Sequence, residues 1–168
     1  MSAEIIKVYK QDIPAVRFIG KKYGNNDRVD GMFGKHWGDW FQNGWFDIIV
    51  KQTETDLKTV YEDGDAYIGL MHKNEDGHFE YFIGVFMPEN TSVPDGYEHL
   101  DFTKGTLGVC WVYGKEADVY MHEGECVKKL KEAGYNISET WCFERYCCPR
   151  FTTPDEKGNV ILDICFYL

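Results

Sequence analysis

The sequence has 168 residues, 43% of them hydrophobic and 27% charged, which suits one soluble domain and excludes a disordered tail or a collagen-like repeat. Acidic residues outnumber basic ones by 28 to 18, giving a formal net charge of −10. Nucleic-acid binding requires a basic surface that neutralises phosphates, so we expect no direct nucleic-acid partner. An acidic field favours neutral or cationic partners, although the same charge also serves solubility. The aromatic fraction of 16% exceeds the usual need of a core, which predicts that some rings line a cavity or an interface.

The N-terminus, beginning Met1-Ser2-Ala3-Glu4, has no apolar segment of the signal-peptide type. No stretch approaches the length of a membrane span either. We therefore expect a cytoplasmic protein that makes no membrane contact. In a reducing cytoplasm its cysteines are expected to be reduced core thiols.

The six cysteines all lie in the C-terminal part of the chain, at Cys110, Cys126, Cys142, Cys147, Cys148 and Cys165. His122 and Cys126 are four residues apart on a predicted helix, a spacing that suits a metal. No second ligand pair has matching spacing. The adjacent Cys147 and Cys148 are expected to point to opposite faces of a strand and to chelate poorly. We expect neither a metal nor a cofactor.

Residues 4–9 and 14–19 are β-rich, which predicts one strand of varying regularity. From Phe33 the apolar residues recur at helical spacing and form an aromatic face. The pair Asn43-Gly44 interrupts this pattern, so two short helices and one kinked helix are both compatible with it. Residues 66–72 and 78–87 then predict two strands around a turn that contains Asp-Gly.

The segment 88–96 holds two prolines and several turn residues and is the most linker-like part of the chain. Residues 97–102 and 106–113 are β-rich again. Residues 116–133 have a helical pattern ended by a glycine. Two further strands are predicted, over 139–148 and 160–168.

The two halves of the chain, about 1–88 and 97–168, each contain a strand, a helix and a hairpin in the same order. This order predicts an α+β fold made of a tandem βαββ repeat with pseudo-twofold symmetry. Its antiparallel sheets would join with the helices on one face and leave a central ligand cleft between the halves. An α+β domain without internal symmetry is the alternative.

Several short motifs occur along nearly the whole chain: Ile13-Pro14-Ala15-Val16-Arg17-Phe18-Ile19-Gly20, Phe33-Gly34-Lys35-His36-Trp37-Gly38-Asp39-Trp40-Phe41, Tyr81-Phe82-Ile83-Gly84-Val85, Gly105-Thr106-Leu107-Gly108-Val109, Trp141-Cys142-Phe143-Glu144-Arg145-Tyr146 and Asp163-Ile164. Each motif is weak alone. In this order they resemble the GyrI-like family, also called the bacterial transcription-activator effector-binding domain.

The resemblance implies two βαββ units around a cleft that binds small, often aromatic or cationic, molecules. Many members are fused to a helix-turn-helix domain, for which this chain has no spare length, so it resembles a stand-alone member. Stand-alone relatives include drug-binding proteins, gyrase-protecting proteins and hydrolases of cyclopropane-bearing DNA-alkylating natural products.

Glu144 is the main candidate for chemistry, because a carboxylate is unusual within the aromatic run from Trp141 to Tyr146. The resemblance implies a buried Glu in this strand, facing a cationic or polar group of the ligand. A carboxylate walled by rings is either protonated more readily or kept charged by a cation, and both states are useful. The alternative is a surface residue or a cross-strand salt bridge. Strand alternation places Tyr146 on the same face as Glu144.

Asp163 is a second acid within an apolar run, and hairpin pairing is expected to bring it near Glu144, unless it is a structural acid bound to backbone amides. Aromatic rings stack on flat ligands and attract cations, each contributing about 0.5–2 kcal/mol. The complete set of candidate ligand-binding residues is Glu144, Tyr146, Tyr81, Tyr67, Trp40, Trp111, Trp141, Phe143, Asp163 and Tyr167. Any single ring is equally compatible with the core.

These observations predict a protein that binds a small aromatic, neutral or cationic molecule. The first alternative is a hydrolase on the same scaffold, in which Glu144 activates water. The second is a protein-interaction module of the gyrase-protecting kind, with a protein as its partner.

Overall fold

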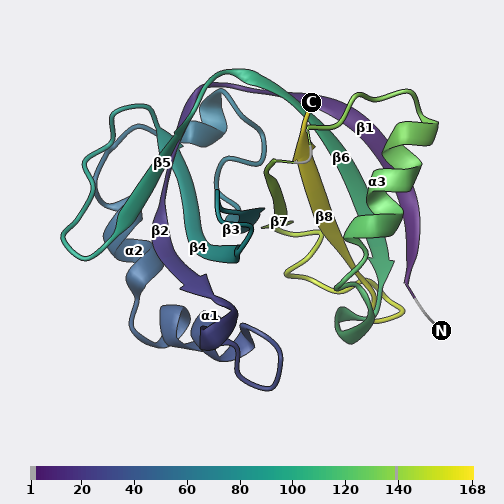
Figure 1. The fold of residues 1–168 in the computed structure, drawn as a ribbon, viewed down its shortest axis with the longest axis horizontal. Coiled ribbons are helices and arrows are strands. Elements are labelled where there is room, and N and C mark those ends of the chain that lie inside the picture. The colour runs from purple at the N-terminus through teal and green to yellow at the C-terminus, as the bar shows by residue number, and fades with distance from the viewer. Residues whose placement is uncertain (1–2, 139) are drawn as a thin grey trace. The chain divides into compact units, whose positions relative to one another are not determined.

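The computed structural model describes residues 3–138 and 140–168, which form two compact units. The N-terminal unit comprises residues 14–103. The C-terminal unit combines the start of the chain, up to Ile13, with residues 104–168. The first strand was expected in the first half of the repeat, but it pairs with a strand of the second half, as Figure 1 shows in purple and green.

The N-terminal unit is an antiparallel sheet with two helices on one face. Its strands lie in the order β3-β4-β2-β5. The elements are β2 (Val16–Gly24), a 3-10 turn (Asn25–Asp27), α1 (Gly34–Gln42), α2 (Trp45–Val50), a second 3-10 turn (Leu57–Thr59), β3 (Tyr67–Lys73), β4 (Phe79–Pro88) and β5 (Glu98–Phe102). Gly44, with φ of 66°, separates the two helices, which settles the question of one kinked helix or two.

The C-terminal unit has a matching strand order, β1-β6-β8-β7, also antiparallel. Its elements are β1 (Glu4–Ile13), β6 (Gly105–Gly114), a 3-10 turn (Glu116–Asp118), α3 (Glu123–Glu132), β7 (Cys142–Tyr146) and β8 (Val160–Tyr167). In each unit a βαββ motif is flanked by one extra strand, β5 or β1. The predicted α+β class with a repeated βαββ motif is confirmed.

Three predicted elements differ from the structure. The single strand over residues 4–19 is two strands, because Pro14 lacks the N–H that a continuous ladder requires and β1 and β2 pair with different strands. The helix over 116–133 begins only at Glu123, since Met121 has a left-handed φ of 66°. The strand over 139–148 is confined to β7, while Glu139 lies outside the described residues.

The core of the C-terminal unit lies between α3 and its sheet. Cys126 and Leu130 of α3 pack against Cys110 and Ile164, and all four are fully buried. Side chains alternate along a strand, so the neighbours of Cys110 and Ile164 in sequence face the opposite side of the sheet. The unit therefore has a helix-covered face and an opposite face, and both matter for the candidate site.

No disulfide joins any of the six cysteines, all of which belong to the described part of the chain. Cys147 and Cys148 follow the end of β7 instead of lying within a strand as expected, and only Cys148 is exposed. Among the described residues, no helix has the length and apolar character needed to cross a membrane.

Candidate functional site

Glu144 lies in the middle of β7 and is only 8% exposed. Its partner on β8 is Ile164, which belongs to the core beneath α3. Directly paired residues of antiparallel strands share a face, so the carboxylate of Glu144 lies on the helix-covered face. The surface-residue alternative for Glu144 is therefore wrong.

A phenol contacts this carboxylate. The Tyr146 hydroxyl donates a hydrogen bond to Glu144 Oε2 over 2.8 Å, which confirms that the two residues share a face. The Tyr146 ring meets the ring of Phe151 edge-on, with centroids 4.8 Å apart. The carboxylate thus accepts a hydrogen bond from a hydroxyl whose ring is itself held by packing.

Burial and nearby charges, including that of Glu144, raise the pKa values of two further groups, Tyr120 and Cys142. Burial raises the pKa of Tyr120 above its usual range, and the negative charges of Glu116 and Glu144 raise it further. Burial, with the charges of Glu123 and Glu144, raises the pKa of the Cys142 thiol to about 12. We call Glu144, Tyr146, Tyr120 and Cys142 the carboxylate cluster. The raised pKa values keep Tyr120 and Cys142 uncharged at neutral pH, so Glu144 is the one carboxylate that this cluster can offer to a cation or a polar group.

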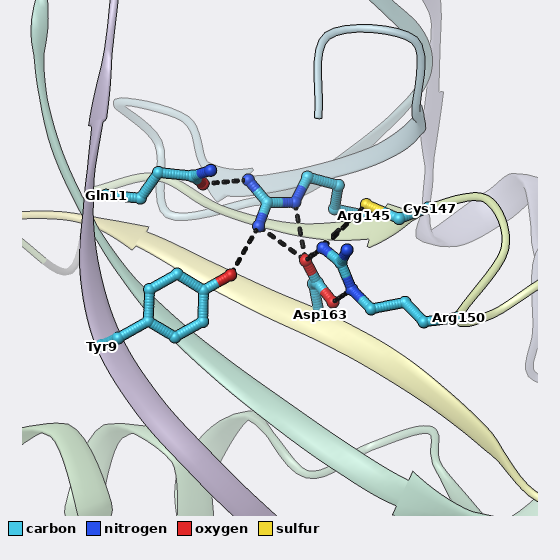
Figure 2. A network of polar contacts seen from close by, with 6 residues as sticks. All are labelled: Tyr9, Gln11, Arg145, Cys147, Arg150 and Asp163. Atoms are coloured by element: carbon cyan, nitrogen blue, oxygen red, sulfur yellow. Dashed lines mark hydrogen bonds and ion pairs between the residues drawn. The ribbon is translucent and has the colours of Figure 1, made fainter. Parts of the chain in front are cut away.

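The opposite face of the same sheet holds a buried ionic network around Asp163 (Figure 2). Arg145 Nε and Nη2 donate to Asp163 Oδ2 over 2.8 and 2.6 Å, and both side chains are 0% exposed. Arg150 Nε donates to Asp163 Oδ1 over 2.9 Å, and Arg150 Nη2 donates to Oδ2. One carboxylate is thus held by two guanidinium groups, in the charge-assisted geometry that suits arginine.

β1 supplies further partners of Arg145 in this network. Arg145 Nη1 donates to Gln11 Oε1 over 2.6 Å, and Nη2 lies 3.5 Å from the Tyr9 hydroxyl (Figure 2). Burial raises the pKa of Tyr9 to about 12, even though the positive charge of Arg145 lowers it. Cys147 Sγ lies 3.1 Å from Arg150 Nη2. The network therefore fastens β1, β7, β8 and the loop after β7 to one another.

The two acids do not meet, contrary to expectation. Asp163 is paired with Arg145 in the register, whereas Glu144 is paired with Ile164. A step of one residue along a strand reverses the face, so Glu144 and Asp163 lie on opposite sides of the sheet. The partners of Asp163 are guanidinium groups and not the backbone amides that the structural alternative expected.

The other aromatic candidates of the C-terminal unit belong to the opposite face or precede β7. Trp111 is the register partner of Asp163, meets Tyr9 edge-on at 5.8 Å and lies beneath the Arg150 guanidinium at 5.0 Å. Phe143 is fully buried, with its ring centroid 6.4 Å from that of Tyr167. Trp141 is partly buried just before β7. Of the candidates in this unit, only Tyr146 contacts Glu144 in a described hydrogen bond.

The three aromatic candidates of the N-terminal unit lie in its helix–sheet core. Trp40 is 0% exposed and its Nε1 donates to the Tyr23 hydroxyl over 3.0 Å. Tyr81 accepts a hydrogen bond of 3.0 Å from Trp37 Nε1. Tyr67 stacks on Phe46 with centroids 3.9 Å apart. For these rings the packing role that the sequence left open is the observed one.

Sequence reasoning missed the partners of both acids, namely Tyr120 beside Glu144 and the arginines around Asp163. Asp163 is the lone charge of β8, and Arg145 lies on the opposite face of β7 from Glu144, so a charge of opposite sign on the neighbouring strand indicates a cross-strand pair. It also missed a half-buried pair in the N-terminal unit, where His72 Nε2 donates to Glu80 Oε1 over 2.7 Å. Lys22 Nζ adds an ion pair of 3.5 Å to Glu80.

Solved structures with this fold come from several bacteria. A putative transcription regulation protein of Staphylococcus aureus is 16% identical, with a TM-score of 0.64 over 96% of this chain and 97% of its own. The protein SAV2435, solved with bound tetraphenylphosphonium, is 17% identical, with a TM-score of 0.66 over 96% and 93%. An integron cassette protein of Vibrio cholerae is 13% identical, with a TM-score of 0.53 over 98% and 97%. The TM-scores show a common fold, and at such low identities the similarity shows the fold alone.

No curated protein sequence matches the chain. The family model of Cass2, described as an integron-associated effector binding protein, matches residues 5–166. The match spans both units, from the first residues of β1 to the end of β8. The chain therefore belongs to the Cass2 family of integron-associated effector-binding proteins, a GyrI-like family.

Proposed function

We propose that this protein binds a small molecule, aromatic and either neutral or cationic, with Glu144 as its anionic anchor. The observation that carries the proposal is the nearly buried carboxylate of Glu144, held by the Tyr146 hydroxyl in a protein of an effector-binding family. Membership of that family supports small-molecule binding. The charge and the aromatic surroundings of the carboxylate suggest the class of ligand.

The chemistry of the carboxylate cluster favours a cation or a polar group on a flat ligand. A carboxylate in partly dry surroundings attracts a cation more strongly than one in water, because the local dielectric constant is low. Aromatic faces add about 0.5–2 kcal/mol for each ring that a cation contacts. The net charge of −10 favours the same sign of ligand at longer range.

The network on the opposite face supports this role by fixing β7. Arg145 is adjacent to Glu144 and is held to β8 and β1 through Asp163 and Gln11. A strand held on one face cannot easily rotate, so the Glu144 carboxylate keeps its direction toward the helix-covered face. Preorganisation of this kind lowers the cost of ordering a binding group.

The experiment compares tetraphenylphosphonium, a cation known to bind SAV2435, with triphenylphosphine oxide, a neutral analogue of similar shape. Titration calorimetry is performed on the wild type and on Glu144→Gln. We expect micromolar binding of the cation, about −8 kcal/mol. Glu144→Gln should weaken it by about 1.5–3 kcal/mol, the usual worth of a hydrogen bond to a charged group. The neutral analogue should lose much less.

Glu80→Gln is the matched control, because it removes one negative charge from an acid of the N-terminal unit. Equal losses in Glu144→Gln and Glu80→Gln would mean that only the net charge matters, and would overturn the anchor role of Glu144. Binding that survives in Glu144→Gln while turnover of a strained electrophile falls by about 10²–10⁴-fold would instead identify Glu144 as a general base of a hydrolase.

A further inference from the structure

The ammonium group of Lys21 in β2 contacts two aromatic rings of the N-terminal unit. Lys21 Nζ lies 4.7 Å from the ring centroid of Trp45 and 4.4 Å from that of Tyr97. Both distances are within the range of a cation–π interaction. Trp45 is the first residue of α2, whereas Tyr97 directly precedes β5, so two separate segments of the unit build this arrangement.

A third ring, that of Trp40, contacts both rings of the pair. Trp40 is fully buried and meets the ring of Trp45 edge-on at 5.6 Å and that of Tyr97 at 6.0 Å. The indole of Trp40 is itself held by its hydrogen bond to Tyr23. The two rings that contact the cation are therefore fixed by packing and form a preorganised aromatic cage, here defined as Trp45 and Tyr97 supported by Trp40.

Lys21 makes few polar contacts for a partly buried lysine. Its Nζ donates to the Gly96 carbonyl over 3.0 Å, and within the described residues no carboxylate lies at ion-pair distance from it. Arg17, earlier on the same strand, shows the usual arrangement of a basic side chain: its guanidinium donates two hydrogen bonds to the Asp101 carboxylate. The described contacts of the Lys21 ammonium are thus the two rings and one carbonyl.

We propose that the cage of Trp45 and Tyr97 is a second binding site, specific for an alkylammonium group, and that Lys21 is its internal occupant in the unliganded protein. Lys21, Trp45 and Tyr97 are all partly exposed, so a cation from solution can reach the rings when the lysine side chain swings out. This site is built by the N-terminal unit alone and does not depend on the role proposed for Glu144.

A quaternary ammonium is the chemical class that fits best. It carries a diffuse positive charge and no N–H, so it requires rings and no carboxylate, which is what the cage provides. The Lys21 ammonium in the cage differs from a quaternary ammonium in that its N–H groups need an acceptor, and the Gly96 carbonyl is that acceptor. The net charge of −10 enriches cations around the protein without favouring any one site.

The test uses choline and its neutral isostere 3,3-dimethyl-1-butanol, observed through the indole N–H signal of Trp45 in NMR spectra. Lys21→Met removes the charge and keeps the aliphatic stem. An internal occupant lowers the fraction of empty cages. The choline concentration needed to shift the Trp45 signal should therefore be at least about 10-fold lower for Lys21→Met than for the wild type. The neutral isostere should leave the signal unchanged in both proteins.

Two controls make the result decisive. Adding Tyr97→Leu to Lys21→Met should abolish the choline shift, whereas adding Glu144→Gln should leave it intact. A second variant, Lys21→Gln, retains a donor for the Gly96 carbonyl. Absence of a Trp45 shift at about 100 mM choline, far above the millimolar range of weak sites, in folded Lys21→Met or Lys21→Gln would overturn the proposal. Unfolding of both variants would also overturn it and assign Lys21 a structural role.

Discussion

Glu144 and Asp163 are buried acids on neighbouring strands of one sheet, yet their surroundings have opposite chemistry. Asp163 is held by the guanidinium groups of Arg145 and Arg150 on the face away from α3. Glu144 accepts a hydrogen bond from the uncharged hydroxyl of Tyr146 on the face beneath α3. The shift of one register position separates the two environments.

This difference shows that one sheet can hold two buried acids in chemically different surroundings, one on each face. A carboxylate between two guanidinium groups is important for stability, because removing it leaves uncompensated positive charges in the protein interior. A carboxylate that accepts from a phenol has surroundings that a ligand cation can complement. The two acids should therefore respond differently to the same chemical change.

The largest effect is expected for Asp163→Asn. It leaves Arg145 buried with a neutral partner, and breaking a buried pair in this way destabilises a protein by about 3–5 kcal/mol. Glu144→Gln, the matched change on the other face, should leave the free energy of unfolding unchanged or higher, because a buried carboxylate is costly. Urea denaturation measures both variants. Equal destabilisation by the two would remove the distinction between the faces.

Truncation of Arg150 tests the same network from its more exposed side. Asp163 keeps Arg145, so Arg150→Ala should cost less than Asp163→Asn, about 1.5–3 kcal/mol for lost charge-assisted hydrogen bonds. Arg17→Ala is the control, because its partner Asp101 is 58% exposed and such surface pairs contribute about 0–1 kcal/mol. A cost for Arg150→Ala no greater than that of the control would show that Arg150 adds nothing to the buried pair.

Local patterns predicted the elements whose partners are near in sequence. The hairpin of β3 and β4 follows from two apolar runs around an Asp-Gly turn, and the break at Gly44 from a glycine within a helical pattern. The shared face of Glu144 and Tyr146 follows from strand alternation alone, and the hydrogen bond between them confirms it.

Long-range pairing set the limit of that reasoning. β1 pairs with β6, about a hundred residues further along the chain, and no local pattern encodes such a choice. The face on which Glu144 lies depends on the register of β7 against β8, which the sequence leaves open by one residue. The cage around Lys21 joins Trp45 and Tyr97 from separate segments, which no local pattern brings together.

A smaller effect should distinguish the hydroxyl of Tyr146 from an ordinary surface phenol. Tyr146→Phe keeps the ring against Phe151 and removes the donor to Glu144, so it should lower the free energy of unfolding by about 0.5–1.5 kcal/mol. Tyr113→Phe is the control, since that hydroxyl donates to the exposed Asp155 and should matter less. If the two variants lose equal stability in urea, the Glu144 carboxylate is no better protected than a surface acid.

The smallest effect concerns Glu80, a third acid that extends the comparison to the N-terminal unit. Burial raises the pKa of Glu80, but the hydrogen bond from His72 and the charge of Lys22 together bring this pKa below its ordinary 4.5. A lowered pKa in the folded state means that the stabilisation is present above pH 4.5 and is lost as the pH falls through the folded value.

Glu80→Gln should therefore lower the free energy of unfolding at neutral pH by about 0.2–1 kcal/mol, the scale of a partly exposed ion pair. The difference between variant and wild type should vanish once the pH falls below the folded-state pKa of Glu80, itself below 4.5, because the wild-type carboxyl is then neutral as well. Thermal unfolding at a series of pH values measures this convergence. Two parallel curves would show that Glu80 acts through packing, and the pairing with His72 would then contribute nothing to stability, unlike the pairing of Asp163 with its arginines.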